Sequence, residues 1–257
     1  MEETKTITSS VFTAKLAQYW SDFVDCDKRL LTEAPFLLST LSQYKDGLVL
    51  DAAMGNGCES IFLLKKGFHV LSNEIDTNLI HLATQAAKRG GVTLDVTSYD
   101  WQEIGSGLPP GSVDAIILLG NSLCLLEDSN TIEEVLGNFF YILKTGGCLI
   151  VDERNFSYIL EKREEILDGN FRYSGKYIYC GTKITGRPIQ ISNQSVVFGY
   201  FENGNDLVGE LKMYPFKSKE LKYLLRNVGF SEVRVLSDFQ ERFDPNADFY
   251  TYLAFKR

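Results

Sequence analysis

The residues with the clearest chemistry follow a short apolar run, Leu48–Leu50. The segment Asp51-Ala52-Ala53-Met54-Gly55-Asn56-Gly57 comes next, and its glycines would let a tight backbone turn approach a ligand closely. A second apolar run ends in Glu74, whose carboxylate could accept hydrogen bonds from both hydroxyls of a ribose. Together the two segments indicate a nucleoside site. The alternatives are a glycine turn in an ordinary α/β protein and a helix-capping acid at Glu74.

The same segment lacks the features that bind a phosphate. Dinucleotide sites use the fuller Gly-x-Gly-x-x-Gly run, so that backbone N–H groups and a helix dipole meet the pyrophosphate. In this chain Ala53 occupies the position of the first glycine of that run. Glu59 would place a carboxylate beside any phosphate. The pattern Asp-x-Ala-x-Gly-x-Gly resembles motif I of the class I S-adenosylmethionine-dependent methyltransferases, whose cofactor has a ribose and no phosphate. S-Adenosylmethionine is therefore the expected cofactor, and S-adenosylhomocysteine the expected product.

Composition narrows the range of partners. The chain has 257 residues, 44% of them hydrophobic, which is enough for one large domain or one domain with an insertion. A formal charge of −8 argues against a nucleic-acid partner, because phosphate neutralisation needs clustered Lys and Arg. No apolar run approaches the roughly 20 residues of a membrane span. A small-molecule, amino-acid-like substrate and possible homo-oligomers are expected.

The cysteines and histidines indicate neither disulfides nor a metal. Five cysteines is an odd number, and none lies in Cys-x-x-Cys spacing, so reduced core thiols and a cytoplasmic location are expected. They are Cys26, Cys58, Cys124, Cys148 and Cys180. His69 and His81 have no partner at ligand spacing, so no metal site is predicted. The N-terminus does not resemble a signal peptide.

Strands and helices alternate through the first two thirds of the chain. Helical patterns cover about 10–45, and strands are predicted at 47–53, 68–74, 92–97, 114–119 and 147–153. Helices are predicted at about 57–66, 77–89 and 130–143, the last ended by Gly146 and Gly147. This alternation implies a Rossmann-like parallel sheet with helices on both faces.

The pattern changes after residue 170. β-Rich runs at 176–180, 190–201 and 209–214, with an Asn-Gly turn signal at 203–204, favour an antiparallel insertion. A helix at about 218–228 and strands at 231–236 and 248–255 follow. The predicted divisions are an N-terminal helical cap (1–45), a cofactor-binding core (46–160), an inserted substrate subdomain (161–215) and a C-terminal part completing the sheet (216–257).

Narrower segments resemble the glycine/sarcosine N-methyltransferases. They are Gly120-Asn121-Ser122-Leu123, Asp152-Glu153-Arg154-Asn155 with Ile159-Leu160, Tyr177 to Gly181, Met213-Tyr214-Pro215 and Ser237 to Glu241. The resemblance implies a seven-stranded sheet with an antiparallel strand near the C-terminus and a small subdomain inserted after the fifth strand. It also implies methyl transfer to the amine of glycine, sarcosine or dimethylglycine.

Substrate residues follow from strand ends and from the resemblance. Arg154 lies just past a predicted strand, where α/β sheets bind ligands, and the matching family arginine holds the substrate carboxylate. Asn121 matches an asparagine near the amino group, and Tyr179 and Tyr214 match tyrosines that close over the site. The alternatives are a surface or salt-bridged arginine, a turn-forming asparagine and half-buried strand tyrosines. At 240–243 the sequence departs from the mammalian-type members and is closer to bacterial betaine-pathway members.

The remaining candidates would bind the cofactor. The resemblance places Asp100 and Trp101 at the adenine, Leu119 beneath the cofactor, Arg29 at the methionine carboxylate and Trp20 near the sulfonium. A buried tryptophan with a capping aspartate would give the same Asp-Trp pair. Asp51 is expected to orient the glycine turn or to reach the cofactor amino group through water. The predicted cofactor-binding set is Trp20, Arg29, Asp51, Ala53, Gly55, Gly57, Glu74, Asp100, Trp101 and Leu119.

Two other functions fit the sequence. One is S-adenosylmethionine-dependent methylation of another small carboxylated or amine metabolite. Arg154 separates it from the first hypothesis, because a substrate lacking a carboxylate has no use for this arginine. The other is a non-catalytic S-adenosylmethionine-binding protein. Intact Glu74, Asp100, Trp101 and Asn121 argue against it.

Overall fold

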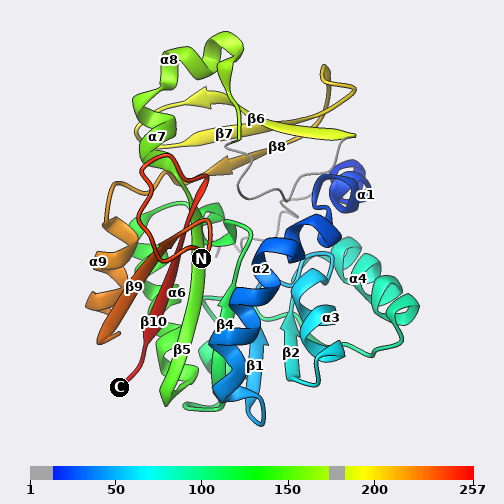
Figure 1. The fold of residues 1–257 in the computed structure, drawn as a ribbon, viewed down its shortest axis with the longest axis vertical. Coiled ribbons are helices and arrows are strands. Elements are labelled where there is room, and N and C mark those ends of the chain that lie inside the picture. The colour runs from blue at the N-terminus through cyan, green and yellow to red at the C-terminus, as the bar shows by residue number, and fades with distance from the viewer. Residues whose placement is uncertain (1–13, 174–182) are drawn as a thin grey trace, which may run out of the picture.

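A seven-stranded sheet forms the centre of the molecule (Figure 1). The structure, a computed structural model, describes residues 14–173 and 183–257. The strands run in the order β3-β2-β1-β4-β5-β10-β9. β10 is antiparallel to both neighbours, whereas the other pairs from β3 to β5 are parallel. The predicted seven-stranded fold with one antiparallel strand near the C-terminus is confirmed. The bounds are β1 Leu48–Asp51, β2 His69–Asn73, β3 Asp95–Thr97, β4 Val113–Leu118, β5 Leu143–Arg154, β9 Glu232–Ser237 and β10 Phe249–Phe255.

Two groups of helices pack on this sheet. α2 contacts α3, which contacts α4, whereas α6 contacts α5 and α9. In Figure 1, α2 lies in front of the strands and α6 behind them. The bounds are α2 Cys26–Leu41, α3 Cys58–Lys65, α4 Thr77–Gly90, α5 Ile104–Gly107, α6 Ser129–Ile142 and α9 Glu220–Asn227, with short 3-10 turns η1 Ser42–Tyr44 and η2 Ser122–Leu125.

Local sequence fixes where the longer helices begin and end. Asp76 precedes α4 and its carboxylate accepts the N–H groups of Asn78 and Leu79 at 2.8 and 3.2 Å. Asp128 caps α6 in the same way. Gly91, with φ +74°, ends α4 in the left-handed region that glycine adopts without strain. These caps place the loops between strands and helices.

A second, three-stranded antiparallel sheet is inserted after β5, in the order β6-β7-β8. Figure 1 shows it above one end of the main sheet, beside α1. Its strands are β6 Ile184–Ile191, β7 Val196–Glu202 and β8 Asp206–Met213, and the segment from β5 contains α7 Phe156–Glu161, α8 Arg163–Glu165 and η3 Ile166–Asn170. α1, Ala14–Phe23, contacts β6 and β8.

Two boundaries differ from the sequence-based predictions. The β-rich run at 190–201 is interrupted by a turn, in which the Ser192 N–H donates to the Ser195 carbonyl at 2.9 Å. β5 begins at Leu143, so the predicted glycine turn lies within that strand. The predicted strand at 176–180 lies outside the described residues. No helix in the described ranges is long and apolar enough to cross a membrane.

Candidate active site

A cavity of about 480 Å³ lies where the loops after β1, β2 and β4 meet α1 and the inserted sheet. Its walls include ten of the fourteen predicted site residues. These are Trp20, Arg29, Ala53, Gly55, Glu74, Asp100, Trp101, Leu119, Asn121 and Arg154. Residues from the N-terminal helices, the core and the fifth strand therefore line one cavity.

The glycine turn and Glu74 form one unit. The Gly55 N–H donates to Glu74 Oε2 at 2.9 Å, and the N–H groups of Ile75 and Asp76 donate to Oε1 at 2.9 and 3.0 Å. Gly55 and Gly57 have φ of +57° and +88°, which other residues adopt only with strain. Burial raises the pKa of Glu74, and these three N–H groups oppose the rise. The backbone thus holds the carboxylate at the cavity wall, with acceptor capacity left for a ligand hydroxyl.

The loop after β3 places an aromatic ring beside the glycine turn. The Trp101 Nε1–H donates to the Ala52 carbonyl at 2.7 Å, and Asp100 Oδ1 accepts the N–H of Gln102 at 2.9 Å. Asn73 ties this loop to β2, because its side-chain amide bonds both the N–H and the carbonyl of Tyr99. Asp100 and Trp101 face the cavity from this fixed loop.

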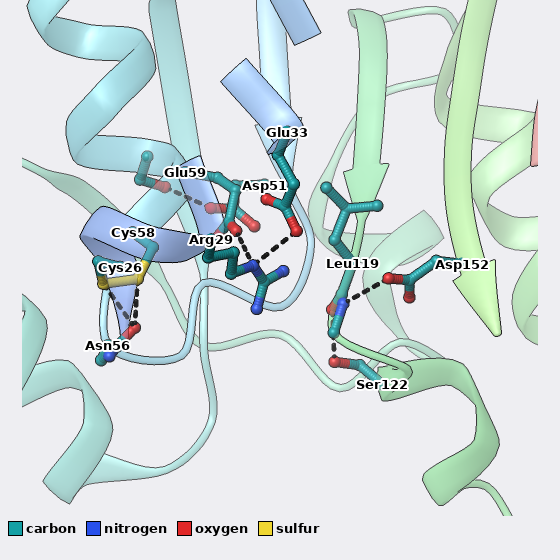
Figure 2. Close-up of polar contacts among 12 residues, drawn as sticks. Cys26, Arg29, Glu33, Asp51, Asn56, Cys58, Glu59, Leu119, Ser122 and Asp152 are labelled. Atoms are coloured by element: carbon teal, nitrogen blue, oxygen red, sulfur yellow. Dashed lines mark hydrogen bonds and ion pairs between the residues drawn. A yellow bond between two sulfur atoms is a disulfide. The ribbon is translucent and has the colours of Figure 1, made fainter. Parts of the chain in front are cut away.

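Arg29 reaches the cavity from α2 and is buried. Figure 2 shows the carboxylates of Glu33 and Glu59 both directed at its Nε, and each Oε1 atom lies 2.7 Å from that nitrogen. Its Nη1 lies 3.4 Å from where a Gly120 Cβ would be, which places the guanidinium beside the carboxyl end of β4. The role predicted for Arg29 at the methionine carboxylate stays a prediction.

Asp51 lies behind the cavity lining. Ser60 Oγ donates to Asp51 Oδ2 at 2.6 Å and lies 2.8 Å from Ser72 Oγ, which links β1, α3 and β2. Burial, followed by the charge of Glu59, raises the pKa of Asp51 to about 7. The role expected for Asp51 at the glycine turn stays a prediction. Gly57 also lies outside the cavity lining, at the start of α3.

Asn121 joins the ends of β4 and β5. Its Oδ1 accepts the Arg154 N–H at 2.8 Å, and its own N–H donates to Asp152 Oδ1 at 2.6 Å. The Asn121 Nδ2 lies 3.4 Å from Met213 Sδ on β8. Its φ of +62° matches the tolerance of asparagine for the left-handed region. Asn121 thus combines the predicted site position with its turn-forming alternative.

Arg154 is only 4% exposed, so the surface alternative is wrong. Its guanidinium carbon lies 4.6 Å from the ring centroids of Phe198 and Phe249 and 5.2 Å from that of Tyr173. These rings come from β7, β10 and the segment after η3. The guanidinium therefore packs against the faces of three aromatic rings, which attract a cation.

Glu153 alternates with Asp152 and Arg154 along β5 and points to the other face of the sheet. Its carboxylate accepts the hydroxyl hydrogen of Tyr252 on β10. Burial raises the pKa of Glu153 to about 8, against the Tyr252 hydrogen bond. Glu153 is therefore a buried structural acid, away from the cavity lining.

Tyr214, like Asp51 and Gly57, lies outside the described cavity lining. The Tyr214 hydroxyl donates to Glu220 Oε1 on α9 at 2.6 Å. Tyr179 lies outside the described residues. The roles of both tyrosines stay predictions.

An aromatic wall of the cavity was not predicted. The rings of Trp20 and Phe23 from α1 lie 5.8 and 4.8 Å from that of Tyr200 on β7. Phe23 and Tyr200 also crowd Gly186 on β6, where a Cβ would lie 3.1 Å from each ring. The helical spacing of apolar residues in α1 indicates an apolar face. It does not indicate that Tyr200, far along the chain, packs against that face.

The expectation that all cysteines are reduced is wrong for Cys26 and Cys58, which form a disulfide (Figure 2). Each is the first residue of its helix, α2 and α3, and their Cα atoms lie 5.5 Å apart. The packing of these helices, which sequence spacing does not reveal, brings them together. Cys124 and Cys148 are buried free thiols, and Cys180 lies outside the described residues.

Comparisons with known proteins place this chain among methyltransferases. A family profile described as "Methyltransferase domain" matches residues 49–147. A glycine/sarcosine N-methyltransferase from Aphanothece halophytica is 31% identical over 238 residues, covering 92% of this chain and 86% of that protein. A glycine/sarcosine/dimethylglycine N-methyltransferase from Actinopolyspora halophila is 32% identical over 240 residues, covering 92% of this chain and 41% of that protein.

Solved structures share the fold at low sequence identity. A S-adenosylmethionine-dependent methyltransferase from Clostridium acetobutylicum superposes with a TM-score of 0.69 at 15% identity. The superposition covers 94% of this chain and 97% of that one. At this identity the likeness shows the fold alone.

Proposed function

Because this chain belongs to the glycine/sarcosine N-methyltransferase family of S-adenosylmethionine-dependent methyltransferases, we propose that it methylates the amine of glycine, sarcosine or dimethylglycine. The observation that carries the proposal is Arg154, a buried guanidinium at the cavity that packs against two phenylalanine rings. A guanidinium binds a carboxylate through two parallel hydrogen bonds. A small amino acid supplies that carboxylate together with an amine.

The cavity fits S-adenosylmethionine by its donor and acceptor set. Glu74 presents a backbone-held carboxylate for ribose hydroxyls, and Trp101 presents an aromatic ring beside Asp100. Arg29 presents guanidinium N–H groups for the methionine carboxylate. When bound, S-adenosylmethionine supplies an electrophilic methyl group on its sulfonium.

The protein's own residues position the amine and exclude water. Arg154 binds the substrate carboxylate, and Asn121 fixes the Arg154 backbone through a 2.8 Å hydrogen bond. The aromatic wall of Trp20, Phe23 and Tyr200 closes the cavity on the α1 side. Neither histidine lines the described cavity, so the substrate is expected to enter as the neutral amine, and positioning supplies the rate enhancement.

A panel of amines tests the proposal. Purified protein with methyl-labelled S-adenosylmethionine would be given glycine, sarcosine, dimethylglycine and ethylamine, which has no carboxylate. We expect labelled product from at least one amino acid and none above background from ethylamine. Transfer only to ethylamine would contradict the role of Arg154.

The same assay separates the alternatives. Cofactor binding without transfer to any amine would favour a non-catalytic S-adenosylmethionine-binding protein. Transfer only to other carboxylated metabolites would keep the Arg154 assignment and change the substrate.

A further inference from the structure

The Cys26–Cys58 disulfide lies beside the cavity. Cys26 begins α2 and Cys58 begins α3, and their Cα atoms lie 5.5 Å apart. Several residues within three positions of each cysteine line the cavity. They are Val24 and Arg29 near Cys26, and Gly55, Asn56 and Glu59 near Cys58. The bond therefore joins two segments of the cavity wall that are distant in the sequence.

An ion pair joins the same two helices. Arg29 Nε on α2 lies 2.7 Å from Glu59 Oε1 on α3, and each side chain is 7% exposed. Glu59 directly follows Cys58, and Arg29 lies about one helical turn after Cys26. Opening the disulfide removes the covalent restraint next to both members of this pair. The two helix starts, and with them the Arg29 side chain and the glycine turn, are then held only by noncovalent contacts.

Asn56 lies against both sulfur atoms. It belongs to the glycine turn and is 8% exposed, and its Oδ1 lies 3.1 Å from Cys58 Sγ and 3.8 Å from Cys26 Sγ (Figure 2). Neither sulfur of a disulfide carries a hydrogen, so neither can donate to this oxygen. In the dithiol form each sulfur gains an S–H group that can donate. Opening the bond therefore changes the hydrogen bonding of a residue in the cavity wall.

Reduction of the bond needs a dithiol as co-reactant. Its thiolate attacks the sulfur of Cys26, which is partly exposed, whereas Cys58 is 4% exposed. The disulfide breaks as a mixed disulfide forms, and Cys58 leaves with the electron pair and takes up a proton. The second thiolate of the reductant then displaces Cys26, which is protonated in turn, and the reductant closes into its own disulfide. Two electrons and two protons pass to the protein, and a disulfide oxidant reverses the exchange.

We propose that Cys26 and Cys58 form a reversible redox site that controls cofactor affinity, with the disulfide form binding S-adenosylmethionine more tightly than the dithiol form. The bond holds Arg29 and the glycine turn in one arrangement before the ligand enters. A site that is already ordered loses less conformational freedom on binding. This inference rests on the proposed cofactor site and is independent of which amine is methylated.

Calorimetric titration of both redox forms with S-adenosylmethionine tests the proposal. Wild-type protein would be reduced with dithiothreitol under argon, and a thiol assay should find two more free thiols than in the oxidised protein. Circular dichroism would check that the reduced protein keeps its fold. We expect the dissociation constant to rise about tenfold on reduction, within the usual range for coupling between two sites.

Two serine variants separate this disulfide from the other thiols. Cys26→Ser should bind S-adenosylmethionine as weakly as reduced wild type and should not respond to dithiothreitol. Cys148→Ser is the matched control, because Cys148 is a buried free thiol outside the described cavity lining. It should show the same loss of affinity on reduction as wild type. If Cys26→Ser does not fold, the two redox forms of the wild type still carry the test.

The coupling must also work in reverse. If the disulfide form binds tenfold more tightly, saturating S-adenosylmethionine should make the reduction potential of the bond more negative by about 30 mV, the value for a two-electron couple. Dithiothreitol redox buffers would measure this shift.

Dissociation constants within twofold of each other in the two redox forms overturn the proposal, and so does a potential that the ligand does not move. Loss of the fold on reduction also overturns it, because the bond would then be only a structural crosslink. No binding in either form would refute the proposed cofactor site itself. The titrations contain no amine, so failure of the amine substrates in the methyl-transfer assay leaves this result standing.

Discussion

Replacing Arg154 with lysine separates the shape of the guanidinium from its charge. Arg154→Lys keeps one positive charge but loses the planar fork, and with it one of two charge-assisted hydrogen bonds, worth about 1.5–3 kcal/mol. The guanidinium carbon also lies 4.6 Å from the ring centroids of Phe198 and Phe249, and a lysine ammonium keeps only part of this cation–π attraction. Together these losses weaken transition-state binding by about 2–3 kcal/mol, which corresponds to a fall in kcat/KM of roughly 30- to 150-fold.

The assay is initial-rate methyl transfer to the best amino-acid substrate, with cofactor affinity measured by calorimetry. Cofactor affinity should stay within about threefold of wild type. Arg187→Lys is the matched control, because Arg187 stacks 3.8 Å from the Phe201 ring in the inserted sheet and lies outside the described cavity lining. An unchanged kcat/KM in Arg154→Lys, or an equal fall in both variants, would refute the reasoning.

Three further predictions follow from buried acids and the disulfide. Glu74→Gln should weaken S-adenosylmethionine binding by about 1.5–3 kcal/mol in calorimetry, and an affinity within twofold of wild type would count against the ribose contact. Burial raises the pKa of Glu153 from 4.5 to about 8, so its stabilising contribution is complete below pH 4.5 and is lost as the pH rises to 8. Glu153→Gln should reduce this loss in urea unfolding between pH 5 and 8, and an identical pH slope would contradict it. Cys26→Ser removes the disulfide that links residues 32 positions apart. Without reductant, the free energy of unfolding should fall by roughly 3–4 kcal/mol relative to wild type. Equal urea midpoints for the variant and the wild type would contradict this prediction.

Local chemistry made much of the fold and of the cavity lining predictable. Gly55 and Gly57 lie in a turn that needs positive φ. Asp76 caps a helix by accepting the N–H of Leu79, three residues further along the chain. Residues close together in the sequence decide both features. The strand ends carrying Glu74 and Arg154 then converge, because the carboxyl ends of parallel strands meet at one edge.

Contacts between distant segments were not predictable in the same way. The Cys26–Cys58 disulfide and the Arg29–Glu59 ion pair both depend on how α2 packs against α3. Periodicity says which face of a helix is apolar, but not which neighbour covers it. The aromatic rings around Arg154 come from β7 and β10 for the same reason, and no spacing in the sequence indicates them.

A crystal structure of the complex with S-adenosylhomocysteine and sarcosine tests the central claim most directly. The account predicts the ribose hydroxyls at Glu74 and the sarcosine carboxylate paired with the Arg154 guanidinium, with the amine directed toward the sulfur. Sarcosine bound with its carboxylate away from Arg154, or a ribose that does not contact Glu74, would contradict it.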